Sequence, residues 1–130
     1  MSITHRKLAG NVYLVNINGP LNVTHAGEVN RHLVQLAGKG AKRIVVNLTD
    51  VPFIDGPGLK TLVTGYKLFG RQNFRLVGLQ IQPTLVLELT GFEHFFLVLE
   101  TVPDAQPVKL SRPNQTQASL SPLTLVAQPV

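Results

Sequence analysis

The side chains best suited to nucleophilic catalysis are scarce in the part of the chain that predicts a folded core. Cysteine is absent, and no serine lies between Ser2 and Ser111. Acyl transfer through a Ser/His/Asp or Cys/His arrangement therefore has no nucleophile there. Without such a nucleophile, the sequence favours a protein that binds over one that catalyses, and we expect no enzyme.

Histidines and carboxylates offer two weaker candidates for chemistry. His25 and His32 stand seven residues apart on one face of a predicted helix, where they could share a metal ion, although we favour solvated or capping histidines. Asp50 and Asp55 flank the end of a predicted strand, as paired carboxylates in hydrolases can. Turns and helix caps favour aspartate in any case. We expect neither a metal site nor a cofactor.

The run Gly56-Pro57-Gly58-Leu59-Lys60-Thr61 follows a predicted strand and opens a predicted helix. It differs from a phosphate-binding loop because its lysine does not follow a glycine directly and the loop is too short to hold a diphosphate. The first amides of the helix could still hold an anion or the carboxylate of a partner. A plain strand-to-helix turn, capped by Asp55 or Gly56 and with Pro57 near the first helical position, is the simpler interpretation.

Apolar periodicity predicts alternating strands and helices as far as Val102. The expected strands are 12–17, 44–48, 74–77 and 96–99. A hairpin strand from Lys7-Leu8, turning at Gly10-Asn11, is expected to precede the first of them. The expected helices follow Thr24 as far as Gly38, run from Leu59 to Gly70, and run from Pro83 to Leu89. This order predicts an α/β fold: a mainly parallel sheet of four to five strands with helices packed on it.

Composition separates a globular part from a tail. Apolar residues make up 44% of the 130 residues and charged residues 15%, which is typical of one folded domain. Residues 103–130 contain five of the nine prolines, so we predict a domain over 1–102 and a flexible tail over 103–130. The short apolar run Leu123-Thr124-Leu125-Val126 in that tail could dock on another surface.

The charge balance and the absence of targeting signals indicate the kind of partner and the compartment to expect. The net charge of +5 raises the odds of an acidic partner. Lys60, Lys67 and Arg71 lie along one side of the second predicted helix, where they form either a solvated surface or a contact for such a partner. Few aromatic residues accompany the basic ones, so we expect no nucleic-acid binding. No apolar run could span a membrane and the start lacks a secretory signal, so we expect a cytoplasmic protein.

Three motifs together resemble the STAS family of anti-sigma-factor antagonists and their relatives. The stretch Val45–Leu59, with Asn47-Leu48-Thr49 and Phe53-Ile54-Asp55-Gly56-Pro57-Gly58-Leu59, is similar to the family's strand ending in "DLS" followed by "F-[IM]-D-S-[ST]-G-L". Gly19–Thr24 is similar to "G-x-L-D-x-x-T", and Leu76–Leu79 with Val86–Phe92 resembles the third strand and the "L-x-x-T-G-L" helix end. The resemblance runs from about Val12 to Val102 and leaves the tail outside.

The resemblance implies a non-enzymatic switch that binds a protein partner, a histidine-kinase-like ATPase serving as anti-sigma factor or a related regulator. In such antagonists the partner phosphorylates the second hydroxyl residue after the motif's aspartate. Here Asp55 matches that aspartate, and Gly56 and Pro57 occupy the hydroxyl positions. Because proline has no hydroxyl, we expect a constitutive binder that is not phosphorylated at this site. Thr61 is a weak candidate for phosphorylation instead. The expected partner-binding residues are Asp55, Gly56, Pro57, Gly58, Leu59, Lys60, Val63, Thr24 and His25.

Two other functions stay open. Related domains occur in membrane transporters, so the chain could be a transporter-associated module that meets the membrane only through that partner. Alternatively, the helix start at Asp55–Gly58 could make the protein a sensor of a nucleotide or another small ligand. The sequence leaves homodimer formation open.

Overall fold

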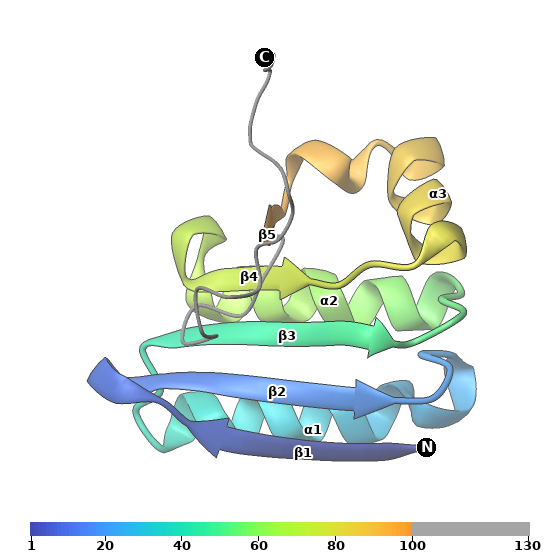
Figure 1. The fold of residues 1–130 in the computed structure, drawn as a ribbon. Helices are drawn as coiled ribbons and strands as arrows, with labels where there is room; N and C mark the ends of the chain where they lie inside the picture. The colour runs from blue at the N-terminus through green and yellow to red at the C-terminus, as the bar shows by residue number, and fades with distance from the viewer. Residues whose placement is uncertain (100–130) are drawn as a thin grey trace, which may run out of the picture.

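Five strands form one sheet in the computed structural model, which describes residues 1–99 (Figure 1). In sheet order they are β1 (Ser2–Lys7), β2 (Val12–Asn18), β3 (Arg43–Asp50), β4 (Phe74–Val77) and β5 (Leu97–Leu99). β1 pairs antiparallel with β2, and all later pairs are parallel. The α/β fold and its mainly parallel sheet are therefore confirmed. The hairpin extends back to Ser2, and left-handed backbone at Gly10 and Asn11 turns it.

Three α-helices and three short 3₁₀ turns connect the strands. The helices are α1 (Val23–Gly38), α2 (Gly56–Phe69) and α3 (Ile81–Thr90); the turns are η1 (Ala9–Asn11), η2 (Arg71–Asn73) and η3 (Phe92–His94). α1 and α2 pack side by side on one face of the sheet, while α3 lies beyond β4 near the β5 edge (Figure 1). This arrangement follows from the sequential strand order, since right-handed crossovers place successive helices on the same face.

The main core lies between the sheet and these helices. It is built from alternate residues of the strands, such as Val15, Val46 and Phe74, and from the apolar stripes of the helices. Gly65 of α2 is part of the fit, because a Cβ there would lie 2.2 Å from the Phe74 ring. The helix can approach the aromatic ring only because this position carries no side chain.

All three helices start earlier than the apolar pattern predicts, α2 at Gly56 rather than at Leu59. α1 begins at Val23, and its cap is Asn22, whose Oδ1 accepts a hydrogen bond from the Thr24 amide at 3.1 Å. Thr24 thus lies inside the first turn. α3 begins at Ile81, so Pro83 is its third residue, where a missing N–H costs no intrahelical bond. In all three helices the first turn contains residues outside the apolar pattern, and the pattern alone does not detect them.

The predicted tail, residues 103–130, and the predicted boundary after residue 102 lie outside the described residues. Within residues 1–99, none of the helices combines the length and the apolar character that crossing a bilayer requires.

Candidate functional site

Asp55 links the starts of two helices through its carboxylate. Its Oδ1 accepts a hydrogen bond from the Gly58 amide at 2.9 Å and so caps α2. Its Oδ2 accepts a second hydrogen bond, also 2.9 Å long, from the Val23 amide at the first residue of α1. The predicted cap is confirmed, and the link to α1 adds to it. Because both oxygens serve helix termini, Asp55 is a structural carboxylate rather than half of an acid–base pair.

The chain passes very close to itself beneath this carboxylate. Leu21 and Ile54 form an isolated parallel bridge, and the Leu21 amide donates to the Phe53 carbonyl at 2.9 Å. A Cβ on Gly58 would lie 1.9 Å from the Leu21 carbonyl oxygen. Glycine is therefore required at position 58 for α2 to begin against the segment that precedes α1. Gly56, by contrast, has open space where a Cβ would stand.

A groove of about 320 Å³ lies between α1 and α2 next to this helix start. Its lining joins small and polar residues of both helices: Ala26, Gly27, Asn30, Pro57, Lys60, Thr61 and Thr64. Pro57 and Lys60 are exposed at its α2 side. The groove thus offers a shallow surface with one cationic side chain, suited to a protein segment that carries a carboxylate.

Only some of the predicted binding residues present a side chain at this surface. Thr24 is exposed in the first turn of α1, and His25 is half-buried with its Nδ1 3.1 Å from the Pro20 carbonyl oxygen. Leu59 belongs to the main core and Val63 packs against it, so neither offers its full side chain to a partner. Thr61 is 5% exposed, and its hydroxyl donates to the Gly58 carbonyl at 2.7 Å.

The amides at the start of α2 are largely occupied. Pro57 has no N–H, Gly58 donates to the Asp55 side chain, and Leu59 donates to the Asp55 carbonyl at 2.8 Å. Three of the first four residues of α2 therefore have no donor left for an anion, and the Asp55 carboxylate adds a negative charge beside them. This geometry weighs against a phosphate site at the helix start.

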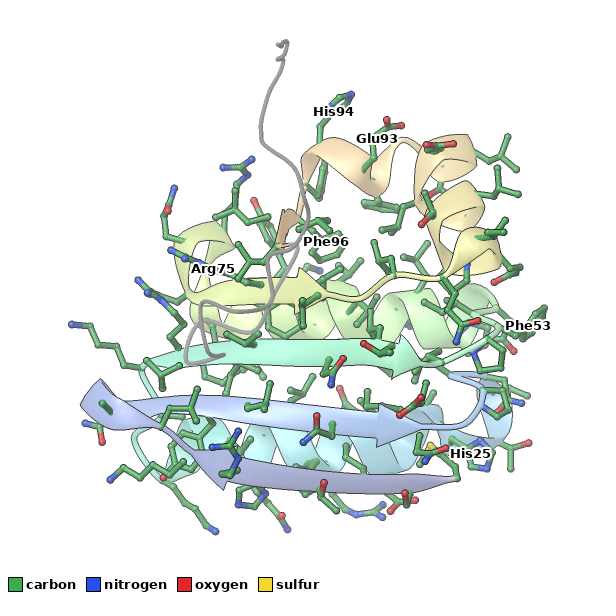
Figure 2. All side chains as sticks on the ribbon, in the orientation of Figure 1. His25, Phe53, Arg75, Glu93, His94 and Phe96 are labelled. Carbon is green, nitrogen blue, oxygen red and sulfur yellow. The ribbon has the colours of Figure 1, made fainter. Side chains whose placement is uncertain are left out.

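Three exposed apolar side chains stand around the same end of the molecule, and the sequence patterns did not single them out. Val23 is 67% exposed, Phe53 45% and Ile81 80%. Phe53 lies at the tip of the loop before Asp55 (Figure 2). Ile81 precedes Gln82, whose side chain bonds both backbone groups of Ile54. The exposure of Val23 could have been predicted from helical periodicity, because Val23 lies off the apolar stripe formed by Val29, Leu33 and Leu36.

The two histidines of α1 have different partners, so they do not share a metal ion. Nε2 of His32 lies 2.7 Å from Nδ1 of His5 on β1, whereas His25 faces Pro20. Burial lowers the pKa of His32 below its ordinary value of 6.5, and the neighbouring His5 lowers it further. Among residues 1–99, no three histidine or acidic side chains come together to hold a metal.

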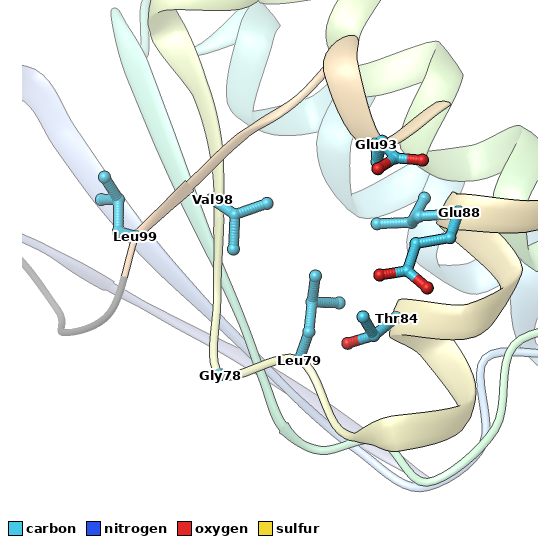
Figure 3. Close-up of a pocket in the computed structure, with 8 residues that line it drawn as sticks. Gly78, Leu79, Thr84, Glu88, Glu93, Val98 and Leu99 are labelled. Atoms are coloured by element: carbon cyan, nitrogen blue, oxygen red, sulfur yellow. The ribbon is translucent and has the colours of Figure 1, made fainter. Parts of the chain in front are cut away.

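A second hollow of about 430 Å³ lies between α3 and the β4–β5 edge, away from the groove (Figure 3). Leu79, Val98 and Leu99 supply much of its apolar lining, with the carboxylates of Glu88 and Glu93 near its rim. None of the residues predicted for partner binding lines it.

Comparisons with known proteins agree with the motifs in the sequence. The family model for the STAS domain matches residues 5–105. An anti-sigma factor antagonist from Mycobacterium paratuberculosis is 24% identical, with 79% of this chain and 90% of that chain covered and a TM-score of 0.68. A Thermotoga maritima protein described as an anti-sigma factor antagonist is 23% identical, with 77% and 87% covered and a TM-score of 0.71.

A transporter shares the fold as well. The murine anion transporter Solute Carrier 26 family member A9 is 19% identical over 75% of this chain and 17% of that chain, with a TM-score of 0.62. At such identities, the likeness to all three structures shows a common fold.

Proposed function

The chain belongs to the STAS domain family, and from that premise we propose that it is a regulatory protein-binding module resembling an anti-sigma-factor antagonist. Its partner is a histidine-kinase-like ATPase that serves as an anti-sigma factor, or a related regulator of transcription in a bacterium. In this role it works in the cytoplasm by binding, without catalysis of its own.

The observation that carries the proposal is the start of α2. Asp55 ties the start of α2 to the start of α1 through the Gly58 and Val23 amides, and by the motif resemblance exposed Pro57 corresponds to the hydroxyl residue that the family phosphorylates. A phosphate at that position would add about two negative charges and disrupt a contact. With no hydroxyl at Pro57, that means of release is missing. The module therefore binds its partner irrespective of the partner's kinase activity.

The surroundings of Pro57 suit a protein contact. The groove beside it carries the Lys60 ammonium, and Val23, Phe53 and Ile81 expose apolar side chains nearby. A mixture of apolar contacts with a cationic rim is typical of transient protein interfaces. An acidic partner surface fits both this rim and the net charge of +5.

Two charge reversals on α2 test this surface. Lys60→Glu alters the groove, whereas Lys67→Glu places the same charge two turns along the helix, outside the groove lining. Both side chains are exposed, so both variants should fold. The full chain is used as bait in lysate of the source bacterium, and bound proteins are identified by mass spectrometry. We expect wild type and Lys67→Glu to retain a kinase-like ATPase, and Lys60→Glu to lose about tenfold in affinity, or ~1.4 kcal/mol. Equal binding by all three chains would contradict the assignment of the groove.

The transporter-associated alternative is favoured by the shared fold with the murine transporter. Co-fractionation of the chain with membranes, and capture of a transporter subunit by the same bait, would support it. The small-ligand alternative has less support because the amides of α2 are occupied. A melting temperature unmoved by millimolar nucleotide would dismiss that alternative.

A further inference from the structure

The hollow between α3 and the β4–β5 edge has one apolar wall and one wall that carries charge (Figure 3). Leu79, Val98 and Leu99 form the apolar wall. α3 and η3 form the other wall, which carries the carboxylates of Glu88 and Glu93. The volume of the hollow, about 430 Å³, falls in the range of about 300–1,000 Å³ that is typical of small-molecule sites.

Local backbone geometry accounts for the open space. Gly78 follows β4 with a φ of 79°, in the left-handed region that favours glycine, and there the chain turns away from the sheet toward α3 (Figure 3). α3 then packs mainly against η3 rather than against the strands. Leu87 of α3 is 2% exposed and belongs to the main core, whereas Val98 of β5 is 48% exposed. The hollow therefore reaches the core at one end and leaves apolar surface open to solvent at the other.

The charged side chains that line the hollow are all acidic, although the chain as a whole is basic. The net charge is +5, yet none of the lining residues, which all lie within 78–99, is basic. Within residues 1–99, no lysine or arginine lies within ion-pair distance of Glu88 or Glu93. Oε2 of Glu93 lies 4.0 Å from Nε2 of His94, whose side chain is 88% exposed. The hollow is thus a local site of negative charge on a positively charged protein.

The polar groups of the hollow determine the charge of the ligand that it suits. Ionised carboxylates accept hydrogen bonds and donate none, so they favour a ligand with charged N–H donors. The hydroxyl of Thr84 already donates to the Gln80 carbonyl at 2.7 Å. An anionic ligand such as a nucleotide would meet two like charges and no cation here. A cation with an apolar body, in contrast, complements both walls.

We propose that this hollow binds a small organic cation, an amine with an apolar body. The ammonium group donates to Glu88 and Glu93, and the body packs on the apolar wall. The body supplies most of the affinity, since ion pairs between exposed groups contribute little in water, and the two carboxylates select for positive charge. The hollow lies apart from the groove beside Pro57, so its ligand can be tested independently of the protein partner.

Three probes that share one apolar body and differ in charge test this site: phenylbutylamine, phenylbutanol and phenylbutyrate. Each is titrated to millimolar concentration into the full, isotope-labelled chain, and methyl signals are followed by NMR. We expect phenylbutylamine to shift the methyl signals of Leu79, Val98 and Leu99, and to bind about fivefold more tightly than the neutral alcohol. Phenylbutyrate should bind more weakly than either, because the two carboxylates repel it.

Two double variants test whether the acidic wall selects the amine. Glu88→Gln with Glu93→Gln should lower the affinity for phenylbutylamine about fivefold, to that of phenylbutanol. The matched control, Glu28→Gln with Asp50→Asn, removes the same two charges outside the hollow and should leave the affinity unchanged. All four side chains are exposed, so both variants should fold.

Three outcomes would overturn the proposal. One is the absence of any shift of the Leu79, Val98 and Leu99 methyl signals with millimolar phenylbutylamine. Another is equal affinity for the three probes, which would show an apolar hollow that does not select by charge. The third is equal affinity of the two double variants for phenylbutylamine, which would show that Glu88 and Glu93 do not hold the ammonium group.

Discussion

Replacement of Asp55 by alanine should destabilise the domain by about twice the cost of losing an ordinary helix cap. One carboxylate oxygen caps α2 through Gly58 and the other binds Val23 at the start of α1. Loss of an N-cap costs about 1 kcal/mol, and a hydrogen bond to a charged group contributes a similar amount or more. We therefore expect a loss of about 2 kcal/mol, equivalent to roughly 8–15 °C in melting temperature for a domain of this size.

Two further variants separate the contributions. Asn22→Ala removes a cap that serves α1 alone, so it should cost about 1 kcal/mol. Asp55→Asn keeps one acceptor but turns an amide N–H₂ toward one of the two donors, so it should fall between Asn22→Ala and Asp55→Ala. Urea unfolding followed by far-UV circular dichroism measures all three. If Asp55→Ala costs no more than Asn22→Ala, the hydrogen bond from Val23 to Asp55 contributes nothing to stability.

Further substitutions test the close approach and the histidine pair. Gly58→Ala should lower the free energy of unfolding by more than about 3 kcal/mol, because the new Cβ would lie 1.9 Å from the Leu21 carbonyl oxygen. Gly56→Ala, where a Cβ has open space, should change it by less than about 0.5 kcal/mol. Urea unfolding midpoints compare the two variants. Because the pKa of His32 is lowered in the folded chain, the unfolded chain binds more protons than the folded chain as the pH falls below about 6.5. The contribution of neutral His32 to stability is therefore complete above that pH and is lost as the pH falls through the folded pKa. His32→Gln should flatten this part of the stability profile between neutral and acidic pH, and an unchanged slope would show that the buried His32 is not its source.

The order of elements was predictable because each depends on local signals. Apolar periods placed the strands and helices, and Asp55 before Gly56-Pro57 marked the cap of α2. The apolar period placed the helix starts too late because first-turn residues such as Val23 and Ile81 are exposed and lie outside the apolar stripes. A pattern of apolar residues indicates which positions are buried, so it does not detect helix residues that face solvent.

The finer features of the candidate site depend on contacts between distant parts of the chain. The second bond of Asp55 reaches across 32 residues to Val23, and the His5–His32 contact spans 27. The need for glycine at position 58 comes from the Leu21 carbonyl, which only the folded chain brings near. Sequence spacing shows which residues share a helix face, but it does not show which segment lies opposite.

Phosphate incorporation, measured together with binding, shows whether this domain binds its partner without control by phosphorylation. The full chain, with wild-type sequence or with Pro57→Ser, is incubated with the captured kinase-like partner and ATP, and phosphate per chain and retained binding are measured together. We expect no phosphate on the wild-type domain and undiminished binding. On Pro57→Ser we expect about one phosphate per chain, with release of the partner. Stoichiometric phosphate on the wild-type domain, for instance on Thr61, together with loss of binding, would contradict binding without control by phosphorylation.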